Sequence, residues 1–483
     1  MRQAFFRNLL FLVMINLLIK PLYIFGIDVA VQNRLGPAQY GLYFILFNFT
    51  FLFQVINDFG IQQFNNTHIA QHPHLLKKYS SIILSLKWGL AAAYLVITVL
   101  TAWLKGIGEG YLGLLVLLSL NQILVSLIGY LRSNISALGL FRLDSIASVM
   151  DRILLIGFCS ILLWGMQDKS VFTVYSFAWA QTIAYVFTVL FTGAIVLKHI
   201  RRFRFSFNHR LILAIFRQSA PYALMILLMA IYLKMDAVFI SELLPDGQIQ
   251  AGYYAQGFRL FDAANMFAFL FSTLLLPMFS RLLTDRKQLK ELAHFSFAWM
   301  WTGAAIVSIL FITWRIQILE ILYTDLSSIS GEIFAWQMAG FPALALTYIY
   351  GSMLLAGGHI WRLVKLYSMA AILYLISIFL IVPRYGAVGT AAISCFISWF
   401  VILYELQLVK HHFGLEIPRN ELIKAIGVIL LGIITYYAVQ NLQSHWAILL
   451  AVQAFVLLLF VLIAKFLSLR EAMDLIRSQK INI

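Results

Sequence analysis

Five basic residues of this 483-residue chain lie inside long apolar stretches of its sequence. They are Lys20, Lys87, Arg152, Lys234 and Arg259. An ionised side chain inside a bilayer is costly unless it faces a cavity or a partner, so a base in a membrane span indicates a functional site by default. We therefore treat these residues as candidate contacts for a ligand.

The five bases are expected at graded depths in the membrane. A rise of about 1.5 Å per residue places Lys87 and Arg152 roughly 10 Å from the cytoplasmic face. On the same scale Lys20 and Lys234 lie roughly 15–20 Å deep, and Arg259 lies roughly 10 Å from the outer face. Such a ladder suits an anionic group such as phosphate or pyrophosphate, because each base replaces part of the lost hydration of the anion.

Acidic residues also lie within the apolar stretches: Asp28, Asp58, Asp151, Asp236, Asp262 and Glu405. Arg259 and Asp262 are three residues apart and could pair on one helical face, whereas residues 234 and 236 do not face each other. Adjacent Asp151 and Arg152 lie near an interface, where a long side chain can reach water. Asp28, Asp236 and Asp262 either bind a coupling cation or balance the charge of the bases, and the sequence leaves both alternatives open.

The composition excludes a water-soluble protein. Apolar residues make up 62% of the chain and charged residues 11%, against roughly 25% charged residues in an average soluble domain. The apolar residues form many long runs, so we expect an all-α polytopic membrane protein. The net charge of +15 falls mostly in short loops, which argues against nucleic-acid binding. Cys159 and Cys395 suggest neither a disulfide framework nor a metal site, and no cofactor is expected.

About fourteen segments are long and apolar enough to span a bilayer, since a spanning helix needs about 20 residues. They lie near 9–31, 40–61, 80–104, 111–131, 146–166, 172–196, 218–241, 253–280, 295–315, 333–356, 364–383, 388–408, 423–439 and 446–467. Most Lys and Arg residues outside these segments occur at the termini and after even-numbered helices. By the positive-inside rule both termini are therefore expected in the cytoplasm.

A basic loop at 198–210 separates the first six predicted helices from the rest. Gly41 and Tyr43, after the first helix, recur 211 residues later as Gly252 and Tyr254, after the seventh. This echo suggests two parallel repeats, as in several transporter folds. The predicted domains are a six-helix lobe over 1–210, a second six-helix lobe over 211–415, and two extra helices with a cytoplasmic tail over 416–483.

Two stretches carry a family resemblance: 34–43 (RLGPAQYGLY) and 57–61 (NDFGI). With them the sequence resembles the polysaccharide-transport branch of the multidrug/oligosaccharidyl-lipid/polysaccharide exporter superfamily, which includes the Wzx-type O-antigen flippases. That branch typically has an Arg-x-Leu-Gly-Pro stretch after its first helix, whereas here Arg34 directly precedes Leu35. Other matching features are Pro221, Lys234-Met235-Asp236, Gly252-Tyr253-Tyr254, Pro277 with Ser280-Arg281, and the Gly-rich stretch 383–389.

The resemblance implies two six-helix lobes and two C-terminal helices around a central cationic cavity. Members of this branch move polyprenyl-diphosphate-linked oligosaccharides from the cytoplasmic to the outer leaflet by alternating access. They do so in surface polysaccharide or lipopolysaccharide biosynthesis at the bacterial inner membrane.

On this interpretation each candidate base has a role. Lys20, Lys234 and Arg259 would hold the diphosphate, Lys87 and Arg152 would contact it first, and Arg34 would lie near the exit. The expected partners are the lipid-linked oligosaccharide, membrane lipid, a coupling cation (H+ or Na+) if transport is coupled, and polysaccharide polymerase or ligase machinery.

Other functions fit the sequence less well. A cation-coupled antiporter of the multidrug type would favour an acidic, cation-attracting cavity. It is kept open by Asp28 and Asp236, although the bases in and at the mouths of the spans are as numerous as the acids. A membrane glycosyltransferase or polymerase is less favoured, because the longest outward loops, 242–252 and 316–332, contain no basic residue. A scaffold has no reason to bury so many charges. We therefore expect a transporter and not an enzyme.

Overall fold

The computed structural model describes residues 2–62, 76–106, 110–166, 172–200, 209–417, 419–440, 442 and 444–464. Among these residues every regular element is a helix, as the sequence predicts. Residues 201–208 of the basic loop and the predicted tail from 465 onward lie outside the described residues.

The chain divides into two compact units, Met1–Ala255 and Gln256–Ile483. The first contains α1 (Arg2–Leu22), η1 (Tyr23–Asp28), α2 (Val29–Leu52), α3 (Gln54–Asp58), α5 (Leu76–Lys105), α6 (Leu112–Ala137), α7 (Phe141–Ser160), η3 (Ile161–Gly165), α8 (Val174–Ile200), α9 (His209–Lys234) and α10 (Asp236–Leu243). Helix α11 (Gly247–Leu282) begins in the first unit and continues into the second. The predicted lobes at 1–210 and 211–415 stay a prediction.

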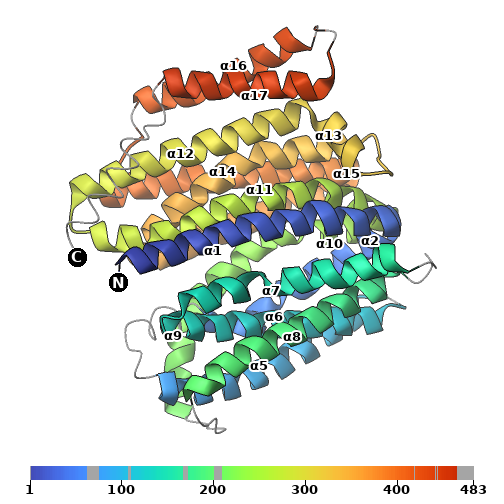
Figure 1. Cartoon of the computed structure of the whole chain (residues 1–483), viewed down its shortest axis with the longest axis vertical. Coiled ribbons are helices and arrows are strands. Elements are labelled where there is room, and N and C mark those ends of the chain that lie inside the picture. Colours follow the sequence, from blue (N-terminus) through green and yellow to red (C-terminus); the bar gives the residue numbers. More distant parts are fainter. Residues whose placement is uncertain are drawn as a thin grey trace. The chain divides into compact units, whose positions relative to one another are not determined.

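In the first unit, helices distant in sequence pack side by side. Helix α6 lies along α8, and α7 packs against both α1 and α8 (Figure 1). Helix α2 contacts α6, α9 and α10. Helix α2 therefore packs against helices that precede the predicted basic loop and against helices that follow it.

The second unit contains α12 (Arg286–Thr313), α13 (Arg315–Leu322), α14 (Ser330–Ala356), α15 (Ile360–Phe413), α16 (Arg419–Val439) and α17 (Trp446–Ile463). Helix α14 is the most deeply buried of these, and it packs against α15 and α12. The last two helices pack against each other and against α12 (Figure 1).

Twelve helices of the described residues are long and apolar enough to cross a membrane, and two of them are long enough to cross twice. These two are Met14–Leu52, with 39 residues, and Ile360–Phe413, with 54 residues. At about 1.5 Å per residue they would measure about 58 and 81 Å, against about 30 Å of hydrocarbon. Counting each as two spans gives fourteen crossings, in agreement with the sequence.

Both long helices contain a glycine with positive φ, and a side-chain contact shows that the first of them doubles back there. Asp28 and Tyr40 would lie about 18 Å apart along a straight helix, yet their side chains form hydrogen bonds of 3.1 and 3.2 Å. Between them, Gly36 adopts φ 72°. Gly386 adopts φ 59° in α15. Glycine suits both positions because it adopts positive φ without steric cost.

The repeated glycines of the sequence mark a close crossing of α2 and α11 within the first unit. A Cβ atom on Gly41 would lie 2.0 Å from the carbonyl oxygen of Gln248, and one on Gly252 would lie 2.0 Å from that of Pro37. Gln248 stands 211 residues after Pro37, as Gly252 stands after Gly41. The two contacts are therefore related as in a two-fold interface, where residue i meets j and j meets i. The side chain of Gln248 also donates to the carbonyl of Ala38, at 2.9 Å.

Adding a methyl group at this crossing is expected to destabilise the protein. We expect Gly41→Ala and Gly252→Ala each to lower the free energy of unfolding by about 1–3 kcal/mol, the usual range for overpacking. Thermal unfolding of the detergent-solubilised protein measures the effect. Gly89→Ala is the matched control, because nothing lies within 4 Å of its added Cβ. Equal melting temperatures for all three variants would contradict the close crossing.

Candidate functional site

The first membrane helix is interrupted just after Lys20. Pro21 removes a backbone donor from the helix, and the following segment η1 winds as a π-helix, a form frequent at functional sites. Lys20 is half-buried, and Asp28 at the end of η1 is 2% exposed. The interruption thus has a base at its start and a buried acid at its end.

The seventh predicted span is also interrupted beside a lysine. The sequence predicts one helix over 218–241, but α9 ends at Lys234 and α10 begins at Asp236. This break places a base at a helix C-terminus and an acid at a helix N-terminus, and the helix dipole favours each charge there. The ammonium of Lys234 lies 5.9 Å from the ring centroid of Phe51 on α2.

Both acids at these interruptions accept hydrogen bonds from tyrosines. The carboxylate of Asp28 accepts from the hydroxyl of Tyr40 and from the side-chain amide of Gln32, the latter at 3.2 Å. Asp236, which is 4% exposed, accepts from the hydroxyl of Tyr254. In each case the tyrosine belongs to the next long helical segment after a turn. A lysine, a buried aspartate and a tyrosine bound to it therefore occur together in both of the segments that the sequence repeats.

Arg152 lies against the interrupted segment η1. Its guanidinium is 4.8 Å from the ring centroid of Tyr23, and its Nε is 3.4 Å from a carboxylate oxygen of Asp151. The sequence predicts only that Arg152 can reach water near an interface, so this ion pair with the adjacent residue is a finding of the structure. Nearby on α2, Tyr43 accepts a hydrogen bond from Gln181 at 2.7 Å. Polar groups from α2, α7, α8 and η1 thus line the interior of the first unit.

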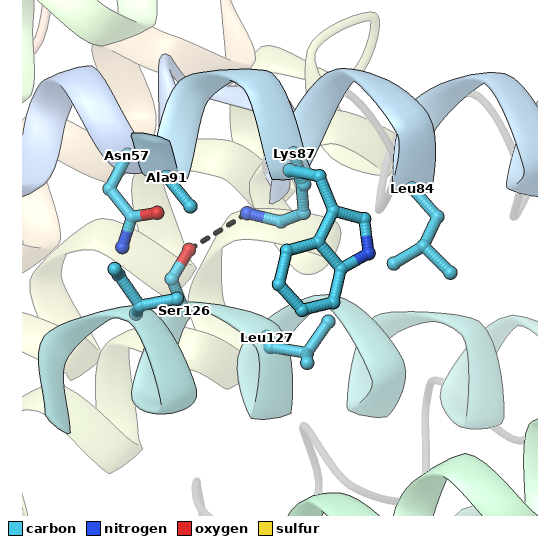
Figure 2. A pocket seen from close by; sticks show the side chains of 8 residues that line it. Asn57, Leu84, Lys87, Ala91, Ser126 and Leu127 are labelled. Atoms are coloured by element: carbon cyan, nitrogen blue, oxygen red, sulfur yellow. Dashed lines mark hydrogen bonds between the residues drawn. The ribbon is translucent and has the colours of Figure 1, made fainter. Parts of the chain in front are cut away.

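Lys87 forms a buried ion pair with an acid that the sequence did not assign to it. Its Nζ lies 2.8 Å from Asp58 Oδ1 and donates to Ser126 Oγ at 2.8 Å. Figure 2 shows Lys87 of α5 pointing toward Ser126 of α6 in a small, mostly apolar pocket, with Asn57 beside it. Because Asp58 already neutralises this lysine, an anionic ligand would have to compete with the carboxylate to bind there.

The remaining candidates lie near the turn at Gly36 and on α11. Arg34 is half-buried two residues before that glycine. Arg259 and Asp262 are half-buried on the part of α11 that belongs to the second unit. Convergence of all the predicted bases on one cavity stays a prediction.

Several ion-pair and hydrogen-bond partners could not be predicted from the sequence. Asp58 and Lys87 are 29 residues apart on different helices, so no helical spacing could pair them. Tyr40 and Tyr254 belong to motifs of the sequence, but those motifs do not identify them as donors to Asp28 and Asp236. The sequence signal for these two contacts is a glycine-containing turn before each tyrosine. Such a turn brings the following helix back toward the acid.

The sequence matches a known family over residues 5–283, described as polysaccharide biosynthesis protein. This match covers more than half of the chain. The chain belongs to the polysaccharide biosynthesis protein family. The resemblance noted from residues 34–43 is thereby confirmed. No protein of curated function matches the chain by sequence.

Solved structures similar to this polysaccharide biosynthesis protein share its fold. The lipid II flippase MurJ, in an inward closed conformation, matches with a TM-score of 0.68 and 16% identity, covering 96% of both chains. An inward-facing multidrug resistance MATE family transporter of the MOP superfamily matches with a TM-score of 0.63 and 12% identity, covering 81% of this chain and 94% of that one.

A MOP superfamily transporter from Pyrococcus furiosus matches with a TM-score of 0.62 and 14% identity, covering 84% of this chain and 95% of that one. These similarities place the chain in the MOP fold. The MurJ match extends over more of the chain than the other two.

Loss of the Lys87 ammonium is expected to destabilise the protein through the acid left behind. We expect Lys87→Met to lower the free energy of unfolding by about 3–5 kcal/mol, because removing one member of a buried ion pair leaves an uncompensated charge. The double variant Lys87→Met/Asp58→Asn should recover most of this loss in thermal unfolding. Lys290→Met, at an exposed position of α12, is the control. Single and double variants of equal stability would contradict the pairing.

Proposed function

We propose that this protein is a flippase that moves a polyprenyl-diphosphate-linked oligosaccharide from the cytoplasmic to the outer leaflet of a bacterial inner membrane. It would work by alternating access, with both termini in the cytoplasm, and would supply surface polysaccharide, O-antigen or lipopolysaccharide biosynthesis. A polymerase or ligase would receive the flipped substrate.

The observation that carries this proposal is the occurrence of basic residues inside the spans of a polysaccharide biosynthesis protein. Lys20, Lys234 and Arg259 are each half-buried within or at the end of a spanning helix. A diphosphate loses most of its hydration in the membrane, and a partly desolvated base restores favourable charge and hydrogen bonding. The fold that the chain shares with a lipid II flippase over 96% of its length is compatible with the same class of substrate.

The helix interruptions support a specific role for the two lysines. In many transporters, broken helices near the bilayer midplane bind substrates and coupling ions. Lys234 lies at such a break, and Lys20 lies just before the segment that winds as a π-helix. We assign the diphosphate to these two bases and Arg259. Contacts with Lys87 and Arg152 precede this binding, and a contact with Arg34 follows it on the outer side.

The buried acids have two roles consistent with this proposal. Asp28 and Asp236 balance the charge of the lysines while the cavity holds no anion, and Tyr40 and Tyr254 hold the two carboxylates in place. Either acid, or Asp262, could alternatively bind a coupling cation. In both roles an acid near each base lowers the cost of keeping a lysine in the membrane before the substrate arrives.

Removal of either central lysine is expected to abolish transport without loss of membrane insertion. We expect Lys20→Ala and Lys234→Ala to lose translocation of a polyprenyl-diphosphate oligosaccharide in proteoliposomes, because the diphosphate loses a charge partner. Translocation is measured as access of the glycan to an enzyme added outside the vesicles.

Lys290→Ala is the control for this experiment, since it removes an exposed base from α12. Expression level and membrane extraction should match the wild type for all three variants. Wild-type translocation in both Lys20→Ala and Lys234→Ala would rule out the assignment of the diphosphate.

A cation-coupled small-molecule antiporter is the second candidate, favoured by the almost complete burial of Asp28 and Asp236. Under the flippase proposal, we expect no efflux of a lipophilic cation such as ethidium, with either a proton or a sodium gradient. Efflux from wild-type cells that is lost in Asp28→Asn would instead establish the antiporter. Asp285→Asn is the matched control, because this acid caps α12 outside the spans.

A further inference from the structure

Glu405 is the most completely buried acid among the described residues, with 0% of its surface exposed. It lies in the part of α15 that follows the turn at Gly386. Eight residues later α15 ends at Phe413, so Glu405 lies about 12 Å from the end of this spanning helix. None of the roles assigned above uses this residue.

A single tyrosine provides the main polar contact of Glu405. The hydroxyl of Tyr367, on the first half of α15, donates to Oε1 at 2.9 Å. On α14, Gly351 allows close approach, since a Cβ there would lie 3.4 Å from Oε1, and the hydroxyl of Thr347 is a second polar neighbour. The other carboxyl oxygen, Oε2, is buried and has no hydrogen-bond partner.

No base neutralises Glu405 within the described part of the chain. From the two segments packed against it, α14 and the first half of α15, Tyr367 is the titratable group that faces it. No ion pair to Glu405 is formed by a described Lys, Arg or His. A carboxylate buried without a counterion is so unfavourable that such a group takes up a proton instead.

We propose that Glu405 is a proton-binding site of the second unit, occupied in this closed arrangement of α14 and α15. The ligand is a single proton on the carboxyl group. The C=O oxygen of this group accepts from the Tyr367 hydroxyl, and its O–H points away from Tyr367. Release of this proton requires water or a base to reach the carboxyl group, and therefore a change in the packing of α14 against α15. If the protein is the flippase proposed above, this site couples a step of its cycle to a proton.

Infrared spectroscopy of the purified full-length protein at pH 7 tests the proposal directly. We expect the spectrum of the wild type minus that of Glu405→Gln to contain a protonated carboxyl C=O band. The matched control is Glu416→Gln, because Glu416 is an exposed acid whose pKa is lowered by its hydrogen bond with Lys410. Apart from the amide bands of the new glutamine, its difference spectrum should contain carboxylate bands and no protonated carboxyl band. Carboxylate bands without a protonated carboxyl band in the Glu405→Gln difference would overturn the proposal.

A second variant keeps the test decisive if Glu405→Gln does not fold. Tyr367→Phe removes the donor to Oε1, and we expect the protonated carboxyl band to shift to higher frequency while keeping its area. An unchanged spectrum would overturn the proposal. Neither measurement uses a lipid-linked substrate, so the outcome is independent of whether the protein transports one.

Discussion

The cost of placing charge inside a membrane governs the arrangement of this protein. Each buried acid for which a contact is described is held by a specific donor, as Asp58 is by Lys87 and Asp28 by Tyr40. These acids differ in the kind of side chain that holds them. Asp58 is held by an ion pair with a lysine, whereas Asp28 and Asp236 accept hydrogen bonds from tyrosine hydroxyls. Glu405, with Tyr367 as its donor, represents the extreme of the second case.

The interruptions of α1 and of the α9–α10 pair fit the same constraint. Continuous helices satisfy their own backbone groups, and they offer no fixed dipole at the middle of the membrane. The break between α9 and α10 creates such a helix end, which can stabilise a nearby charge. This break and the π-helical segment after Lys20 each lie beside a lysine and a tyrosine-bound aspartate. In the substrate proposal these lysines bind the anion, and the acids balance their charge when no anion is bound.

The MOP fold by itself does not distinguish among the functions of its members, since one fold can host different sites. Solved structures with similar folds include both a lipid II flippase and multidrug transporters. The family match over residues 5–283 narrows the biological context to polysaccharide biosynthesis. The proposal of an anionic, diphosphate-bearing substrate rests on the bases within the spans, and it is the part that the transport experiments test.

The sequence alone determined the all-helical membrane fold, because apolar length is a local property of the chain. It also separated the apolar spans on either side of Gly36 and Gly386, the two glycines that adopt positive φ. It also predicted the echo of Gly41 and Gly252. Only the tertiary structure decided that these two glycines meet each other's helices, and that Lys87 pairs with Asp58. Such contacts join residues tens to hundreds of positions apart, and their formation depends on how whole helices cross. No local spacing encodes that geometry.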